Sequence, residues 1–114
     1  METIRGDALR GHLETMILSA LERSEAHGFE VLRRLEAAGC GALHLKEGSL
    51  YPALYRLESA GLIKGKWEDG AGERRGPRRR LYSLTRKGMR RLAEGRAEWS
   101  VFVQVVGGIL GAPA

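Results

Sequence analysis

The side chains best suited to contact a nucleic acid lie in two short stretches of this 114-residue chain. In the first stretch, four apolar residues at i, i+3, i+4 and i+7 define the buried side of a helix: Leu50, Ala53, Leu54 and Leu57. The other side carries tyrosine, serine and arginine, at positions Tyr51, Pro52, Tyr55, Arg56 and Ser59. Hydroxyl and guanidinium groups can bond phosphates or base edges, so this helix is predicted to read a nucleic-acid groove.

The start of this helix has two possible positions. Ser49 can act as N-cap, with Pro52 in the first turn, where its missing N–H costs least. Alternatively the helix begins near Lys46 and loses one hydrogen bond at Pro52, with Gly48 softening the clash with the proline ring. In both cases Ser49 lies near the positive end of the helix dipole, where a phosphate is favoured, and Gly61 ends the helix.

The second stretch is a basic strand that belongs to a predicted hairpin. Two strands, Leu62–Glu68 and Pro77–Leu84, flank a glycine-rich loop at residues 69–76. Between residues 74 and 91 there are nine basic residues and no acid, which is nine of the 19 Lys and Arg in the chain. A basic hairpin beside the minor groove can insert arginine where the potential is most negative. The predicted DNA-contacting residues are Lys46, Ser49, Tyr51, Pro52, Tyr55, Arg56, Arg74, Arg75, Arg78, Arg79 and Arg80.

Three further helices must position these stretches. Helical spacing predicts a helix from Asp7 to Arg23, a turn at residues 24–26, and a helix from His27 to Ala38 with Phe29, Leu32 and Leu35 inward. Residues 43–45 form a short strand or an extended connection. The last helix runs from its N-cap Thr85 to about Leu110. The fold class is therefore mainly α with a β-hairpin wing, a winged helix-turn-helix.

The chain is expected to divide into a winged-helix DNA-binding domain at residues 7–84 and a C-terminal dimerisation helix at residues 85–110. The last helix carries more apolar surface than its own domain needs, so a second copy is expected to cover it. Trp99 belongs to this apolar surface and is expected to be buried with it. The residues predicted to form the dimer are Leu9, Leu13, Leu92, Trp99, Phe102, Val103 and Val106.

The overall composition narrows the possible classes of function. A net charge of +5 and a pI near 9.9 favour an anionic partner. The single cysteine, the absence of a long apolar run and the charged N-terminus predict a cytoplasmic protein that is not a membrane protein. The three histidines lack metal-ligand spacing, and no nucleophile has an evident partner. No metal, no cofactor and no enzymatic activity are expected.

The chain resembles the PadR family of bacterial transcriptional regulators. The resemblance spans roughly residues 9–92 and depends on residues 48–58, 61–63, 76–85 and 88, with Leu9–Leu13 and His27–Val31 similar to the openings of the first two helices. Phe29 and Leu81 stand where the family often has tyrosine. The resemblance, to the short subfamily with one C-terminal helix, implies a homodimeric winged-helix regulator, usually a repressor and often released by a small molecule. Trp99 looks like the last-helix tryptophan that lies beside an apolar cleft between protomers in drug-responsive relatives. This implies that the predicted dimer residues also serve a small apolar or aromatic effector, with simple packing of Trp99 in the dimer as the alternative.

Duplex DNA with a palindromic operator is thus the expected partner. The principal alternative is a winged-helix protein-interaction module whose basic wing meets an acidic protein. An RNA-binding domain would need stacking aromatics on a sheet face, and the predicted strands offer only Trp67 and Tyr82. Binding to DNA by phosphate contacts would depend strongly on salt, whereas a protein partner would bind with little salt dependence.

Overall fold

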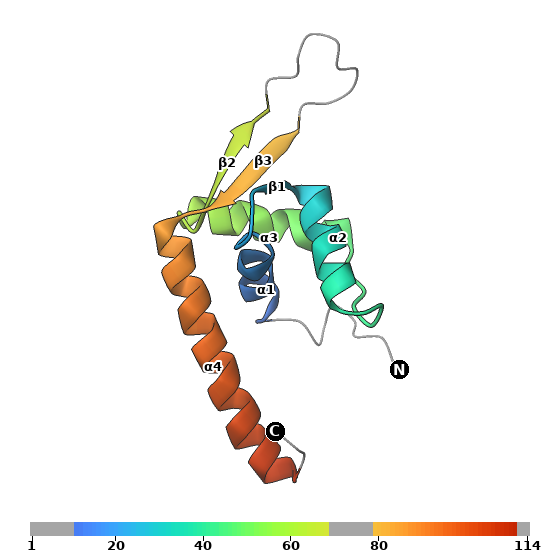
Figure 1. The fold of residues 1–114 in the computed structure, drawn as a ribbon, viewed down its shortest axis with the longest axis vertical. Helices are drawn as coiled ribbons and strands as arrows, with labels where there is room; N and C mark the ends of the chain where they lie inside the picture. The colour runs from blue at the N-terminus through green and yellow to red at the C-terminus, as the bar shows by residue number, and fades with distance from the viewer. Residues whose placement is uncertain (1–10, 69–78, 112–114) are drawn as a thin grey trace.

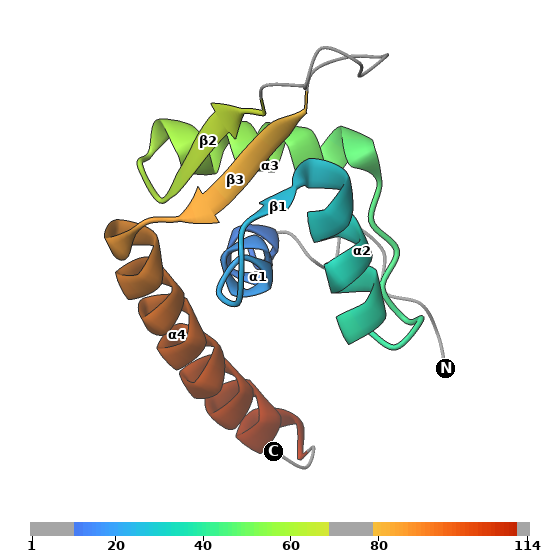
Figure 2. The same cartoon turned by 45° about the horizontal axis from the view of Figure 1, so that its top comes forward.

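The computed structural model describes residues 11–68 and 79–111. Its elements are α1 (Leu13–Ala20), β1 (Ala26–His27), α2 (Gly28–Ala38), α3 (Glu47–Ser59), β2 (Ile63–Trp67), β3 (Arg80–Leu84) and α4 (Arg86–Leu110). The first three helices pack together beneath a small sheet, and α4 leaves the foot of that sheet as a long rod (Figure 1). The molecule is elongated, with extents of 58 × 31 × 21 Å. Seen from a second direction, α1 again lies between α2 and α4 (Figure 2). The predicted winged helix-turn-helix is confirmed.

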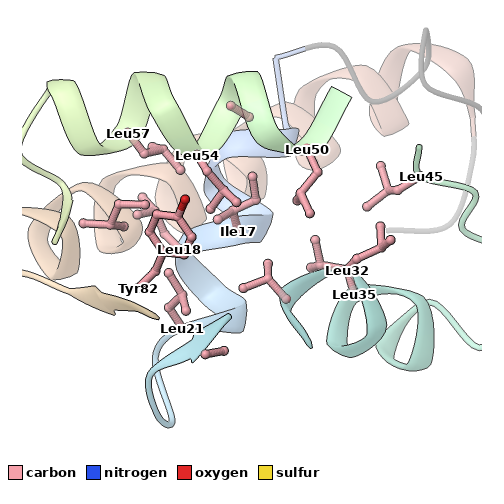
Figure 3. Close-up of a cluster of buried hydrophobic side chains, with 14 of the residues drawn as sticks. Ile17, Leu18, Leu21, Leu32, Leu35, Leu45, Leu50, Leu54, Leu57 and Tyr82 are labelled. Atoms are coloured by element: carbon pink, nitrogen blue, oxygen red, sulfur yellow. The ribbon is translucent and has the colours of Figure 1, made fainter. Parts of the chain in front are cut away.

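One hydrophobic core joins the helices to the sheet (Figure 3). The predicted stripe of α3 is buried throughout, and Leu50, Ala53 and Leu54 are completely inaccessible. Ile17 and Leu18 of α1 and Tyr82 of β3 meet that stripe from the other side. Because this face is packed, the opposite face of α3 is held toward solvent in a fixed orientation.

Of the two predicted start positions of α3, the earlier one is observed. The helix begins at Glu47 after the N-cap Lys46, and Pro52 lies inside it. The Leu50 N–H donates to the Lys46 carbonyl over 3.1 Å. A Cβ at Gly48 would meet nothing within 4 Å, so the packing around this position leaves room for a larger residue.

Gly61 ends α3 by a left-handed turn, as predicted. Its φ is +75°, and its N–H donates to the Glu58 carbonyl over 3.0 Å. The next N–H, of Leu62, donates to the Leu57 carbonyl over 2.9 Å. These two bonds form a Schellman motif, which satisfies the last carbonyls of the helix and turns the chain directly into β2.

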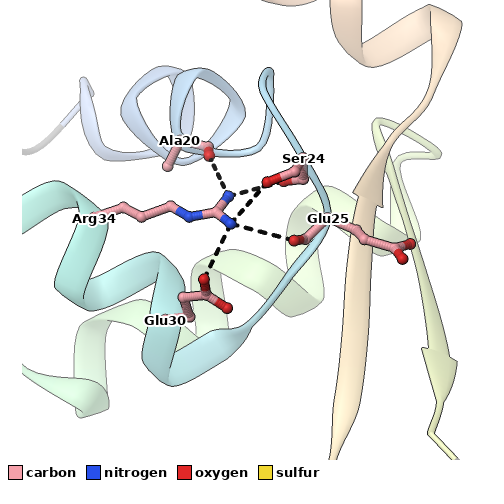
Figure 4. A network of polar contacts seen from close by, with 5 residues as sticks. All are labelled: Ala20, Ser24, Glu25, Glu30 and Arg34. Atoms are coloured by element: carbon pink, nitrogen blue, oxygen red, sulfur yellow. Dashed lines mark hydrogen bonds and ion pairs between the residues drawn. The ribbon is translucent and has the colours of Figure 1, made fainter.

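Within the described residues, α1 is shorter than the predicted helix from Asp7 to Arg23. It starts at Leu13 and ends at Ala20, while Asp7 lies outside the described residues. The guanidinium of Arg34 explains the early end, because it donates to the carbonyls of Ala20 (2.9 Å) and Ser24 (2.8 Å) (Figure 4). The same group reaches the Ser24 hydroxyl, the Glu25 carbonyl and the Glu30 carboxylate. The chain therefore turns around an α2 side chain instead of continuing as a helix.

The sheet contains a strand that the sequence pattern did not predict. Its order is β1-β3-β2, all antiparallel, and Ala26 pairs with Tyr82 while His27 pairs with Leu81. The predicted turn at residues 24–26 thus ends in a strand. Two residues are too few to carry an alternating pattern, so only the partner strand reveals this element.

The inward face of α2 differs from the prediction at one residue. Leu32 and Leu35 are buried as expected, but Phe29 is 53% exposed and Val31 is buried instead. The buried positions Gly28, Val31, Leu32 and Leu35 follow i, i+3, i+4 and i+7, and Phe29 falls outside that stripe. The extended connection that follows, residues 42–46, buries Leu43 and Leu45.

The wing strands are shorter than predicted. Strand β2 covers Ile63–Trp67 instead of Leu62–Glu68, and β3 covers Arg80–Leu84 instead of Pro77–Leu84. One more ladder bond follows, from the Glu68 N–H to the Arg79 carbonyl over 2.9 Å. The predicted loop at residues 69–76, together with Pro77, lies outside the described residues.

The N-cap of α4 is Thr85, as predicted. Its hydroxyl oxygen accepts the Gly88 N–H over 3.0 Å and lies 2.7 Å from the Gly61 carbonyl oxygen. Gly88 packs against the turn after α3, because a Cβ there would lie 2.0 Å from the Leu62 carbonyl oxygen. The helix then continues through Leu110. The foot of α4 is therefore fixed to the end of α3.

Candidate nucleic-acid interface

The outer face of α3 presents polar and aromatic side chains to solvent. Tyr51, Tyr55 and Arg56 are exposed, and Tyr55 reaches 74%. Lys46, Ser49 and Pro52 are also exposed, at and just after the helix start. Six of the residues predicted to contact DNA thus share the solvent side of one helix. Their exposure agrees with the prediction, and their contact with DNA remains a prediction.

Tyr51 leans on the start of α2. A Cβ built on Gly28 would lie 2.7 Å from Cε1 and 3.1 Å from the hydroxyl oxygen of Tyr51. Only glycine leaves room for this ring, so the two helices approach closely at this point. The Tyr51 ring is therefore supported on one side while 45% of the residue stays accessible.

Arg56 lies beside a carboxylate that would compete with a phosphate only weakly. Its Nε donates to Oε1 of Glu14 on α1 over 3.3 Å, and both side chains are about half exposed. An exposed pair of this kind is worth little in water, so a phosphate could displace the carboxylate. The Arg56 guanidinium is therefore accessible to a phosphate.

The side chains of the wing strands alternate between the two faces of the sheet. Ile63, Gly65 and Trp67 share a face with Arg80 and Tyr82, and Ile63 and Tyr82 are buried against the core. The opposite face carries Lys64, Lys66 and Leu81, with both lysines exposed. Arg79 is exposed and, by the same alternation, lies on the lysine side.

Lys64 and Lys66 extend the basic surface beyond the predicted set. They were missed because the arginine run nearby dominated the charge pattern. The signal was present in Lys-Gly-Lys, where alternate residues of a strand must share a face. Of the predicted wing residues, Arg74, Arg75 and Arg78 lie outside the described residues.

Arg80 is engaged within the protein. Its Nε donates to Oε1 of Glu58 on α3 over 3.0 Å, and Nη2 pairs with the second carboxylate oxygen. The guanidinium carbon lies 5.0 Å from the centre of the Trp67 ring, which is directly opposite in the ladder. The hydrogen bond from Arg80 lowers the pKa of the Glu58 carboxyl. Arg79 and Arg80, adjacent in sequence, therefore have different surroundings.

A second polar contact joins the wing to the start of α2. His27 Nε2 lies 2.8 Å from Oε2 of Glu68, just past the end of β2. Both residues lie on the lysine side of the sheet. Among the described residues, no group of three His, Cys, Asp or Glu side chains could hold a metal ion. The contact thus ties together two elements, β1 and the end of β2.

The far half of α4 leaves apolar side chains exposed. Trp99 and Phe102 are each 50% exposed and stack at 5.7 Å between ring centres. The His12 ring meets Trp99 in a T-shaped arrangement, with 5.1 Å between the ring centres. Further exposed residues of this half are Val101, Val105, Ile109 and Leu110. None of the described helices is both long enough and apolar enough to cross a membrane.

Two predicted dimer residues pack against the core of their own domain instead. Leu92 is only 2% exposed and belongs to the core of its own domain, because it lies in the part of α4 that packs on α1. Leu13 also packs against that core, and Leu9 lies outside the described residues. Val103 and Val106 are half-buried, beside the exposed apolar residues of α4.

The near half of α4 is anchored on α1. A Cβ at Gly95 would lie 2.7 Å from the Thr15 side chain, so the helices approach closely there. Arg96 donates to both carboxylate oxygens of Glu22, over 2.8 and 3.0 Å. This bonding lowers the pKa of the Glu22 carboxyl. These contacts fix the near half of α4 to α1 and to the turn that follows it.

Comparison with known proteins gives consistent matches. Residues 17–94 match the model of the transcriptional regulator PadR-like family. The solved structure of a transcriptional regulator from Clostridium thermocellum is 28% identical, covers 93% of this chain and 97% of its own, and has a TM-score of 0.82. For a PadR family regulator from Eggerthella lenta these values are 34%, 91%, 86% and 0.77. The transcriptional regulator YqjI of Escherichia coli is 30% identical over 77% of this chain, which spans 39% of YqjI.

Proposed function

The chain belongs to the PadR-like family of transcriptional regulators, and on that premise we propose that it is a dimeric repressor. Two copies would bind a palindromic operator, and a small apolar or aromatic ligand would release them. The main observation that supports binding to DNA is the division of α3 into a buried apolar stripe and an exposed face of tyrosine, serine and arginine.

The α3 face supports sequence reading in the major groove. Tyr51 and Tyr55 offer hydroxyls to phosphates or base edges and flat rings to thymine methyl groups. Lys64, Lys66 and Arg79 are cations on one face of the wing, suited to the phosphate backbone beside that groove. The helix would supply specificity, and the wing would supply the electrostatic part of the affinity.

The far half of α4 supports a dimer. It exposes Trp99, Phe102 and Ile109 on a helix that extends beyond its own domain. A second copy related by a two-fold axis would cover these side chains and set two α3 helices about 34 Å apart, one turn of DNA. Trp99 and Phe102 would lie near that axis.

Release by a ligand is the finer part of the proposal. The stacked Trp99 and Phe102 rings offer a flat apolar surface that a planar molecule could extend. A ligand that favours one dimer geometry would change the spacing of the α3 helices and shift the population. Quenching of Trp99 fluorescence in a panel of planar aromatic compounds would support this step, provided that Trp67→Phe keeps the response. Unchanged fluorescence across the panel would contradict it.

Binding to an inverted repeat upstream of the reading frame tests the main proposal. If each protomer neutralises about four phosphates, log K should fall with log salt with a slope near −7. A scrambled duplex of the same composition should bind more weakly by a factor of at least about 10³. A slope near zero would contradict the proposal and favour the alternative, a module that binds an acidic protein through its basic wing.

A further inference from the structure

Glu58 and Arg80 join the two parts of the proposed DNA-binding surface. Glu58 lies in the last turn of α3, and Arg80 begins the described part of β3, which is 22 residues further along the chain. Their two-pronged ion pair is the arrangement in which arginine and carboxylate geometries match best. Both side chains are only partly accessible, at 26% for Arg80 and 30% for Glu58. Such a pair constrains orientation more than two exposed charges would.

The Glu58–Arg80 pair has space because the residue of β2 next to it is a glycine, Gly65. A Cβ on Gly65 would lie 2.5 Å from Nε of Arg80 and 2.7 Å from Oε1 of Glu58. Both atoms lie at the ends of flexible side chains, so an added methyl group would displace the pair without forcing the backbone apart. Three elements, α3, β2 and β3, therefore meet at one polar contact.

Two aromatic rings flank the contact. Trp67, two residues after Gly65 on the same face of β2, lies against the guanidinium. Tyr82, which pairs with Gly65, is buried on the other side, where burial raises the pKa of its hydroxyl. The rings limit the directions in which the Arg80 side chain can leave.

We propose that Glu58, Gly65 and Arg80 form a clamp that sets the angle between the wing and α3. In this proposal Arg80 is a positioning residue, whereas its neighbour Arg79 contacts phosphate. The inference rests on the proposed function, because the clamp matters for binding only if α3 and the wing engage the same duplex. Its consequence is that the clamp fixes where the wing meets the backbone once α3 occupies the groove.

Glu58→Gln distinguishes the clamp from a simple charge effect, because the two predict opposite changes in DNA affinity. Removing an acid from a DNA-binding surface, and so freeing an arginine, would normally strengthen binding to every duplex. The clamp instead predicts weaker binding to the operator, by roughly tenfold for one such polar coupling. Glu94→Gln, on α4, removes the same charge from an exposed pair and serves as the control. Stronger operator binding by Glu58→Gln than by Glu94→Gln would overturn the proposal.

Gly65→Ala disrupts the clamp while leaving both charges in place. Its operator affinity should fall about as far as that of Glu58→Gln, and the double variant should be no weaker than either single variant, because both break one contact. Losses that simply add in the double variant would contradict a shared clamp. Thermal unfolding of each variant shows whether the fold is retained.

Measurement without DNA separates this inference from the proposed function. Residual dipolar couplings of backbone amides report the orientation of β2 and β3 relative to α3 in the free protein. Gly65→Ala should change that orientation while the couplings within α1, α2 and α3 stay consistent with one another. An unchanged orientation would overturn the clamp even if the protein binds DNA, and a changed one would support it even if no duplex binds.

Discussion

Helix α3 and the far half of α4 both expose large side chains, but for opposite reasons. In α3 one face is completely buried, and the exposed face carries tyrosines, a serine and an arginine. In the far half of α4, the residues from Trp99 onward are mostly exposed, although many are apolar. The exposed face of α3 is polar and suits contact with solvent. The far half of α4 exposes apolar side chains that nothing in the described part of the chain covers.

The two surfaces also differ in how firmly the rest of the chain holds them. The α3 face is rigid because its orientation is set by packed side chains on the other side of the same helix. Within the described residues, α4 is anchored through Leu92, Gly95 and Arg96 and by the contact of Trp99 and Phe102 with His12, whereas most side chains after Phe102 are exposed. A polar, fixed surface suits recognition of DNA, and an apolar, projecting surface suits association with another copy.

The largest effect should follow from removing the support of α3. Leu54→Ala deletes most of a side chain that is fully buried, so the free energy of unfolding should fall by about 2–5 kcal/mol. Ile109→Ala, at a residue that is 79% exposed, should change it by less than about 0.5 kcal/mol in dilute monomeric protein. Urea unfolding measures both. Similar losses for the two variants would remove the contrast between the regions.

Association should depend on the stacked rings of α4. Replacing Trp99 and Phe102 together by Ala should weaken the dimer by about 2 kcal/mol or more, because large aromatic side chains carry much of the energy of protein interfaces. Sedimentation equilibrium measures the dissociation constant, and Arg23→Ala, an exposed residue of the α1–β1 turn, is the control. A double variant that dimerises as well as the control would show that another surface forms the dimer.

Specific recognition should depend on Tyr51. Tyr51→Ala is expected to reduce operator binding by about 1–3 kcal/mol while leaving binding to scrambled DNA nearly unchanged. Tyr51→Phe keeps the ring over Gly28 and removes only the hydroxyl, so it separates hydrogen bonding from packing. Titration of labelled duplexes provides the constants. Equal losses on operator and scrambled duplexes would exclude a role in sequence reading.

Arg79 should behave as a phosphate contact. Arg79→Ala should weaken operator and scrambled DNA alike, by a factor of only a few, and make the salt slope less steep by about two units, because each protomer of the dimer loses one phosphate contact. The same titrations at several salt concentrations test this. A loss confined to the operator would place Arg79 with Tyr51, and an unchanged slope would remove it from the backbone contacts.

The smallest expected effect is a loss of stability in acid. Glu58 and Glu22 have lowered pKa values in the folded chain, because each accepts hydrogen bonds from an arginine. Their ionised forms therefore stabilise the fold above the ordinary glutamate pKa of about 4.3, and this contribution is lost as pH falls through the lower folded values. Thermal unfolding between pH 6 and about pH 3 should show a shallower decline for Glu58→Gln and Glu22→Gln than for the unchanged chain. Parallel declines would contradict the assignment.

The sequence determined the parts of the fold that repeat at a regular spacing or end in a local signal. The stripe of α3, the left-handed turn at Gly61 and the cap at Thr85 are all local, because each depends on side chains or backbone within one turn. The outer face of α3 followed from the same periodicity. The choice between two starts of that helix did not, since both satisfied the local rules for Pro52.

The remaining features depend on contacts between segments that are distant in the chain, so no local pattern predicts them. The guanidinium of Arg34 ends α1, and β3 defines the two-residue strand β1. The residues predicted to contact DNA included both Arg79 and Arg80, and the folded structure pairs Arg80 with Glu58, which lies 22 residues away along the chain. A sequence records which charges are present, but pairing across space decides which of them stay free.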